Sequence, residues 1–281
     1  MRVLLAAPPS PARLHNLVPL AWALRTAGHD VKIAGQASFV DEILSTGCVA
    51  VDLGTEDTES AALAEFAELW RPDVVVADAQ APAAGVATIR LLGPHDESGP
   101  ADFDTVPPSL RDSPDARPVR HVPYFGPVVV PEWLRRKARR SRVLLSLTDA
   151  TLAGPVFDAV TGLEAEVVWA TDAAEIPAGV TMPPNVRLVD TAPPAALLPT
   201  CGAVVHDGDA SLALAAAAHG VPQLSLTETA IGARIAAAGA GFVGSADRIG
   251  ELASLSGAAT ALRDEIAALP APRELAAALT R

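Results

Sequence analysis

The chain has 281 residues, half of them hydrophobic, so it can bury a large core and is long enough for two domains. Its 33 acidic and 21 basic residues give a net charge of −12, which argues against nucleic acid or an anionic membrane as the main partner. The two cysteines, Cys48 and Cys201, fit no metal-binding spacing, and no apolar run reaches the length of a membrane span. These properties predict a cytoplasmic globular protein.

The first part of the chain alternates short apolar runs with helical patterns. Strands are expected at residues 3–7, 31–34, 49–51, 73–77 and 89–92, and helices at 17–25, 39–44 and 60–70. Near-continuous apolar strands that alternate with helices are typical of a doubly wound parallel sheet.

The alternation stops between residues 93 and 137. This segment is rich in proline, aspartate and arginine, so it is expected to be a loop-rich linker. Its basic end, Arg135 to Arg140, is interpreted either as a solvated face or as a contact for an anion or an acidic partner.

The strand–helix alternation then restarts. Strands are expected at 143–147, 166–169, 186–189, 203–205 and 223–226, and helices at 210–218, 231–238, 249–252, 257–268 and 273–279. The sequence therefore predicts an α/β protein with two Rossmann-like, doubly wound domains, residues 1–137 and 138–281. A ligand is expected in a cleft between the carboxyl ends of their strands.

Several motifs together resemble one family. Residues 204–211 read Val-Val-His-Asp-Gly-Asp-Ala-Ser and residues 218–223 read Ala-His-Gly-Val-Pro-Gln. They are similar to the donor loop of the macrolide and aromatic-polyketide glycosyltransferases of actinomycetes, which reads Val-Val-His-His-Gly-Gly-Ala-Gly and then Ala-His-Gly-Val-Pro-Gln. Further motifs extend the similarity over nearly the whole chain: residues 18–31, 107–111, 121–124, 130–134, 185–190 and 196–201. The resemblance implies a shortened GT-B fold, with deletions after Asp96 and Leu226, and a polyketide-like small-molecule ligand.

Sugar transfer with inversion needs a general base, and the resemblance implies a histidine in the loop before the first helix. Arg13 aligns with that position, and arginine stays protonated, so it cannot serve. His15 is the candidate catalytic substitute if the loop is displaced; the alternative is a helix-start residue that faces the cleft or solvent. Asp78 aligns with the carboxylate that orients the family's base, so it is the second catalytic candidate. A salt bridge between Asp78 and Arg13 is the alternative.

The resemblance places the donor diphosphate on glycine amides at a helix N-terminus. In this chain Asp207 replaces a histidine, Asp209 replaces a glycine, and Asp149 replaces a residue of the family's Gly-Thr or Gly-Ser pair. Each carboxylate is expected to make diphosphate binding less favourable by roughly a kcal/mol or more. Asp209 suits a helix N-cap, whereas Asp207 and Asp149 have no such structural explanation.

The expected ligand-binding residues lie at the ends of strands in both domains. They are Arg13, Asp149, His206, Asp207, Asp209 and Glu228, the last in the region where the family holds the sugar hydroxyls. No cofactor is expected. A less favoured alternative is a Mg²⁺ or Mn²⁺ site formed by Asp149, His206, Asp207 and Asp209.

Three functions remain open. The favoured one is a repurposed family member that has lost nucleotide-sugar transfer and acts on a small-molecule intermediate, for example by cyclisation or proton transfer through His15, Asp78 or the acidic cluster. The second is a non-catalytic partner of another biosynthetic enzyme. The third is an active glycosyltransferase that uses a thymidine-diphosphate (TDP) sugar. A homodimer is compatible with the resemblance.

Overall fold

The chain folds into two compact units. The computed structural model describes residues 1–78, 88–96, 101–111, 115–135, 138, 140–171, 181–189 and 194–279. One unit comprises Met1–Pro127 with Ala268–Arg281, and the other comprises Val128–Ala267. Each unit has its own parallel sheet, which confirms the predicted α/β class with two Rossmann-like units.

The units differ from the expected division into residues 1–137 and 138–281. The first unit already ends at Pro127, and the C-terminal helix α9 (Pro272–Leu279) belongs to it. Leu275 and Ala276 of α9 are buried in one core with α1 (Pro11–Thr26). A short amphipathic helix carries no sequence signal that specifies which sheet it covers, so the contact was not predictable.

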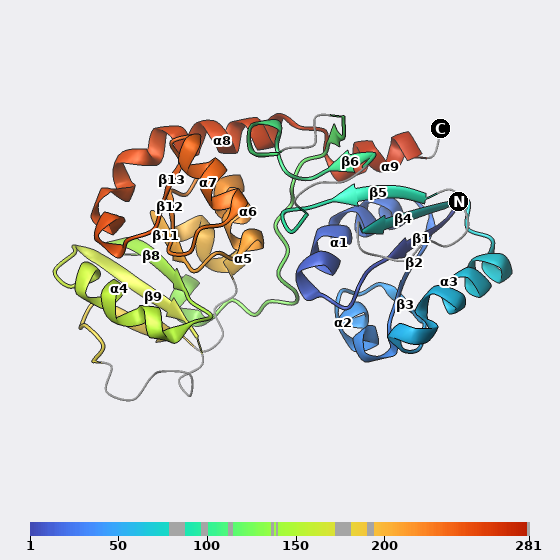
Figure 1. The fold of residues 1–281 in the computed structure, drawn as a ribbon, viewed down its shortest axis with the longest axis horizontal. Helices are drawn as coiled ribbons and strands as arrows, with labels where there is room; N and C mark the ends of the chain where they lie inside the picture. Colours follow the sequence, from blue (N-terminus) through green and yellow to red (C-terminus); the bar gives the residue numbers. More distant parts are fainter. Residues whose placement is uncertain are drawn as a thin grey trace. The chain divides into compact units, whose positions relative to one another are not determined.

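The first sheet has the strand order β3-β2-β1-β4-β5-β6-β7, with parallel neighbours throughout (Figure 1). Its strands are β1 (Arg2–Ala6), β2 (Asp30–Gly35), β3 (Val49–Asp52), β4 (Val74–Asp78), β5 (Thr88–Leu92), β6 (Phe103–Asp104) and β7 (Arg117–Pro118). The first five were predicted. The last two correct the linker assignment, since two-residue strands are too short to show a period.

Helices cover both faces of this sheet (Figure 1). On one face Val3 and Leu5 of β1 pack with α1, α9 and α2 (Val40–Ser45). On the other face Leu4 and Ala6 pack with α3 (Glu56–Trp70). This alternation follows from the two-residue repeat of a strand.

Helix α1 begins at Pro11, well before the expected start at residue 17. Ser10 is extended, and the fixed φ of proline suits the first helical position. Arg13 and His15 therefore lie on the helix rather than in the loop that the family resemblance suggested.

The second sheet has the order β10-β9-β8-β11-β12-β13 and is also parallel. Its strands are β8 (Ser141–Ser146), β9 (Ala165–Ala170), β10 (Val186–Val189), β11 (Ala203–His206), β12 (Gln223–Ser225) and β13 (Gly241–Val243). Its helices are α4 (Ala153–Val160), α5 (Pro194–Leu197), α6 (Ala210–His219), α7 (Ala230–Ala237) and α8 (Ser256–Ala268). Neither α4 nor β13 was predicted. Phe157 of α4 meets Trp169 of β9 edge-to-face in the core of this unit, with ring centroids 5.3 Å apart.

Short 3₁₀ segments connect several of these elements. They are Ala37–Phe39, Pro108–Leu110, Glu132–Arg135, Ala150–Leu152, Leu198–Thr200 and Ala246–Leu255. Within the described part of the chain, no helix has the length and apolarity needed to cross a bilayer.

Candidate functional site

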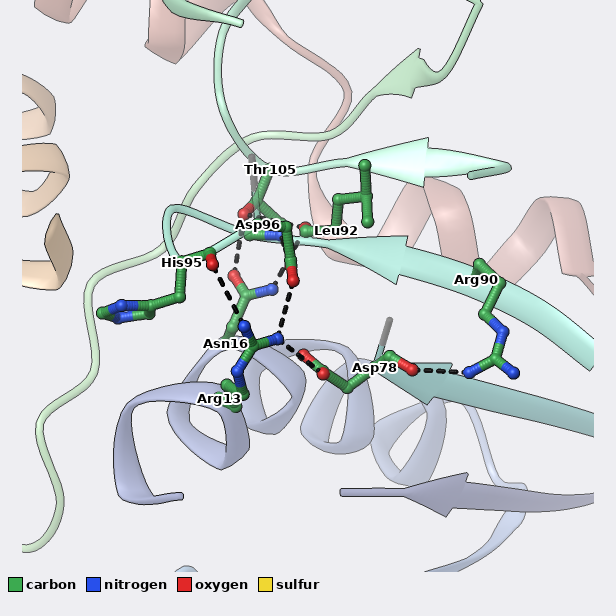
Figure 2. A network of polar contacts seen from close by, with 9 residues as sticks. Arg13, Asn16, Asp78, Arg90, Leu92, His95, Asp96 and Thr105 are labelled. Atoms are coloured by element: carbon green, nitrogen blue, oxygen red, sulfur yellow. Dashed lines mark hydrogen bonds and ion pairs between the residues drawn. The ribbon is translucent and has the colours of Figure 1, made fainter. Parts of the chain in front are cut away.

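The carboxyl edge of the first sheet holds an ion cluster of Arg13, Asp78 and Asp96 (Figure 2). Arg13 lies in the first turn of α1, Asp78 ends β4, and Asp96 follows β5. Nη1 of Arg13 is 2.8 Å from Oδ1 of Asp78 and 2.6 Å from Oδ1 of Asp96. Nη2 donates to the carbonyl oxygen of His95 at 3.0 Å. The predicted salt bridge between Arg13 and Asp78 is present.

The cluster is buried. The side chains of Arg13, Asp78 and Asp96 are 10%, 2% and 5% exposed. Burial alone lowers the pKa of Arg13, but the hydrogen bond to Asp96 and the charges of both carboxylates outweigh it and raise that pKa above its ordinary value. Arg13 therefore remains a cation and cannot accept a proton from an acceptor hydroxyl.

Further hydrogen bonds hold the segment after β5 against α1 (Figure 2). Oδ2 of Asp96 accepts from the backbone nitrogen of Gly93 at 2.8 Å. Asn16 donates to the carbonyl oxygen of Leu92 at 3.2 Å and accepts from the hydroxyl of Thr105 at 2.7 Å. Asp96 is a cluster residue that the sequence reasoning missed. Its position after a strand that neighbours β4 was the signal, since carboxyl ends of adjacent parallel strands meet at one edge.

His15 lies in a different environment. Residues two apart on a helix point about 200° away from each other, so His15 faces away from Arg13. Its Nε2 is 3.5 Å from Oε1 of Glu42, and its ring meets Tyr124 edge-to-face at 5.0 Å. Among the described residues this buried Nε2 has no hydrogen-bond partner. Burial lowers the pKa of His15 more than Glu42 raises it, so the imidazole is neutral near pH 7. The two expected catalytic residues, His15 and Asp78, thus have different contacts.

The carboxyl edge of the second sheet carries Asp149, after β8, and the aspartate loop, residues 207–209, after β11. Oδ2 of Asp207 accepts from the backbone nitrogens of Thr148 at 2.6 Å and Asp149 at 2.9 Å. Oδ1 of Asp149 accepts from the backbone nitrogen of Thr151 at 2.9 Å and from its hydroxyl at 2.5 Å. These bonds lower the pKa of Asp149. Both residues therefore have a structural explanation, contrary to expectation.

Asp209 is the N-cap of α6, as predicted. Its Oδ1 accepts from the backbone nitrogens of Ser211 at 2.9 Å and Leu212 at 3.1 Å. These are amides at a helix N-terminus, the type of donor that the resemblance assigns to a diphosphate. A carboxylate of the protein already accepts from them.

His206 is fully buried beneath this loop. Its Nε2 lies 3.0 Å from Oε1 of Gln223, and its Nδ1 accepts from the backbone nitrogen of Gly208 at 3.1 Å. Because Nδ1 accepts this hydrogen bond, it is unprotonated, so Nε2 carries the hydrogen and the ring is neutral. Burial lowers the pKa of His206 more than Gln223 and the nearby aspartates raise it. Both nitrogens of His206 are thus bonded inside the protein, and a ligand contact of His206 stays a prediction.

Glu228 is exposed in the segment between β12 and α7. This segment adjoins the aspartate loop: a Cβ placed on Gly208 would lie 2.9 Å from the methyl carbon of Thr229. The alternative of a metal site is not supported, because no group of three or more potential ligand side chains is gathered among the described residues. The carboxylates of Asp149, Asp207 and Asp209 instead accept from backbone amides.

Comparison with protein families gives two matches in tandem. Residues 96–148 match the family described as erythromycin biosynthesis protein CIII-like, N-terminal domain. Residues 155–281 match its C-terminal domain.

Individual relatives and solved structures agree with this. The chain is 31% identical to the TDP-daunosamine transferase DnrS of Streptomyces peucetius, over 80% of each chain. It is 30% identical to the aklavinone 7-beta-L-rhodosaminyltransferase of Streptomyces galilaeus, over 80% of this chain and 79% of that protein. The crystal structure of the glycosyltransferase SnogD from Streptomyces nogalater superposes with a TM-score of 0.88 at 29% identity, covering 100% of this chain and 98% of that one. The crystal structure of the glycosyltransferase VinC in complex with DTDP superposes with a TM-score of 0.87 at 28% identity, covering 100% of this chain and 99% of that one.

Proposed function

Since this chain belongs to the erythromycin biosynthesis protein CIII-like family of antibiotic glycosyltransferases, we propose that it acts in such a pathway but has lost nucleotide-sugar transfer. In this proposal the chain binds a polyketide-like intermediate without a sugar donor. The aglycone named for one relative, aklavinone, defines the chemical class of ligand to test.

The ion cluster at Arg13 carries this proposal. General-base catalysis needs a group that can accept a proton near neutral pH. At the position of the family's base, this chain has a guanidinium that is bound to two buried carboxylates and whose pKa is raised. The carboxylate expected to orient the base, Asp78, is committed to that guanidinium.

The aspartate loop supports the same conclusion for the donor. A diphosphate would have to displace Asp207 from two backbone amides and Asp209 from two others. It would also approach their negative charges, at a cost on the order of a kcal/mol or more for each contact. Both effects weaken the binding of a nucleoside diphosphate.

Titration calorimetry with thymidine diphosphate tests the proposal. We expect no saturable heat at micromolar ligand for the unmodified protein. Micromolar affinity would overturn the proposal and favour an active glycosyltransferase.

A triple variant with the family's residues provides the positive control. Arg13→His, Asp207→His and Asp209→Gly restore the residue types of the base and the loop. A gain of thymidine diphosphate binding in this variant would show that these three positions, rather than another difference in the chain, prevent it. A folded triple variant that still fails to bind would contradict the assignment to these residues.

A second candidate function is proton transfer at His15. The observation that favours it is the buried, neutral imidazole whose Nε2 has no hydrogen-bond partner among the described residues. The unprotonated nitrogen of this imidazole can take a proton from an acidic carbon or hydroxyl of a bound intermediate, and Glu42, next to Nε2, would stabilise the resulting cation.

Incubation with aglycone intermediates, without any nucleotide, tests this second function. Turnover that is lost in His15→Phe, which keeps an aromatic ring against Tyr124, but retained in His29→Gln would support it. Binding of an intermediate with no turnover would instead assign the chain the supporting role beside another biosynthetic enzyme.

A further inference from the structure

The amino edge of the second sheet carries a pocket of about 370 Å³. It lies where β8, β9 and β10 begin, at the opposite edge from the aspartate loop. Its lining residues are Arg140, Ala165, Glu166, Pro184, Asn185, Val186 and Arg187. A site here would be separate from the aspartate loop and independent of the proposed function.

Two arginines of this pocket have only long ion-pair contacts in the described part of the chain. Glu166 is held by the buried Arg142, with Nε at 3.2 Å and Nη2 at 2.9 Å. The guanidinium of Arg187 is 3.7 Å from the same carboxylate, and that of Arg140 is 3.7 Å from the exposed Glu164. These contacts involve three arginines and two glutamates, which leaves one excess positive charge. The pocket is therefore locally positive on a chain with a net charge of −12.

Trp133 orders the arginines. The guanidinium carbon of Arg187 lies 5.0 Å from the centroid of its ring, and that of Arg142 lies 5.3 Å from it. Stacking on an aromatic ring restricts a guanidinium without using its N–H donors. Arg187 is therefore partly preorganised, with its side chain 49% exposed and available to a ligand.

Asn185 adds an unused acceptor. Its Nδ2 donates to the carbonyl oxygens of Val160 at 2.9 Å and Leu163 at 3.4 Å, which fixes the orientation of the amide. Its Oδ1 is buried and has no hydrogen-bond partner within the described structure. A buried acceptor without a partner is costly, so a ligand that supplies a donor would be favoured here.

We propose that this pocket binds a small molecule that carries one carboxylate and a neighbouring hydroxyl group. The carboxylate accepts from Arg187 and Arg140, and the hydroxyl donates to Oδ1 of Asn185. A single negative charge matches the excess of one arginine, whereas a doubly charged phosphate would also face Glu164 and Glu166.

Mandelate and phenylacetate are suitable probes, because they have one carboxylate each and differ in a single hydroxyl. Calorimetry on the full chain should show saturable binding of mandelate, and weaker binding of phenylacetate. Arg187→Gln and Arg140→Gln should each weaken mandelate binding by about tenfold or more. Asn185→Ala should remove the preference for mandelate over phenylacetate.

Arg248→Gln is the matched control. Arg248 also stacks on an aromatic ring, that of Phe242, and pairs with a glutamate of the same unit, but it does not line the pocket. Its substitution should leave mandelate binding unchanged. Absence of saturable binding, equal binding of inorganic phosphate, or full affinity in folded Arg187→Gln and Arg140→Gln proteins would overturn the proposal. Circular dichroism verifies that each variant is folded.

Discussion

The carboxylate of Asp207 lies 2.6 Å from the backbone nitrogen of Thr148, and this bond joins the loops that follow two adjacent parallel strands. Asp207 follows β11 and Thr148 follows β8, so an acidic side chain links the two segments between which a donor phosphate is expected in the family. The aspartate acts as an internal anion on amides that would otherwise be open to an external one.

Replacing Asp207 by alanine should destabilise the protein by about 1 to 2 kcal/mol, because two backbone amides lose a charged acceptor. Water can reach this loop, so the cost should not exceed that range. Urea unfolding of the wild type and the variant measures the difference. Asp247→Ala, an exposed acidic change in the same unit, should alter stability by less than about 0.5 kcal/mol. Equal midpoints for both variants would contradict a stabilising role of Asp207.

Two substitutions at Asp209 should have different effects. Alanine at this N-cap should cost about 1 kcal/mol, since the amides of Ser211 and Leu212 lose their acceptor. Glycine, the family's residue, should cost only a few tenths of a kcal/mol. Thermal or urea unfolding resolves the two, and a larger loss for glycine than for alanine would contradict the N-cap assignment.

Removal of the guanidinium from the buried cluster should have the largest effect on stability. Arg13→Ala leaves Asp78 and Asp96 buried without their cation, and breaking such a pair typically costs about 3 to 5 kcal/mol. Adding Asp78→Asn and Asp96→Asn removes the uncompensated charge, so the triple variant should recover part of the loss. Urea unfolding at pH 7 measures both. A triple variant less stable than Arg13→Ala would show that the unpaired carboxylates are not the main cause of the destabilisation.

Acid should destabilise the fold through His206. The pKa of His206 is lowered in the folded state, so between its ordinary value of about 6.5 and the lowered value the unfolded chain binds a proton that the folded chain does not. The contribution of neutral His206 to stability is thus complete above that range and decreases as the pH falls through it. The slope from one such group reaches about 1.4 kcal/mol per pH unit.

Unfolding free energies at pH 7.5 and 5.5 test this dependence. In His206→Asn, the side-chain oxygen can accept from Gly208 in place of Nδ1, and no group at this position titrates. The variant should lose less stability over this interval than the wild type. An equal loss of stability in the wild type and the variant would refute the assignment to His206. His15 and His219, whose pKa values burial also lowers, would then account for the whole effect.

The main architecture was predictable because it depends on local patterns. Apolar runs bounded by glycine, proline or polar residues located five strands in each unit. The missing strands were short, such as Phe103–Asp104, Arg117–Pro118 and Gly241–Val243, and two or three residues do not show a strand period.

The sites were predictable only in part. The pairing of Arg13 with Asp78 followed from the family positions that the two residues occupy. The partners of Asp207 were not predictable, because a carboxylate that accepts from the backbone of another loop depends on the path of both loops. The early start of α1, which separates His15 from Arg13, was marked by Ser10 and Pro11, but the resemblance to the family favoured a loop there.

The packing of α9 on α1 also determines the order in which this protein can fold during synthesis. Residues 128–267 form one continuous unit, and they are translated before Leu275 and Ala276, which complete the core of the other unit. The part of α1 that α9 covers is therefore uncovered when the N-terminal sheet leaves the ribosome, and it stays uncovered until the second unit has been translated. A nascent chain in this state exposes apolar surface for as long as about 140 residues take to translate, which is roughly several seconds to half a minute at ordinary rates.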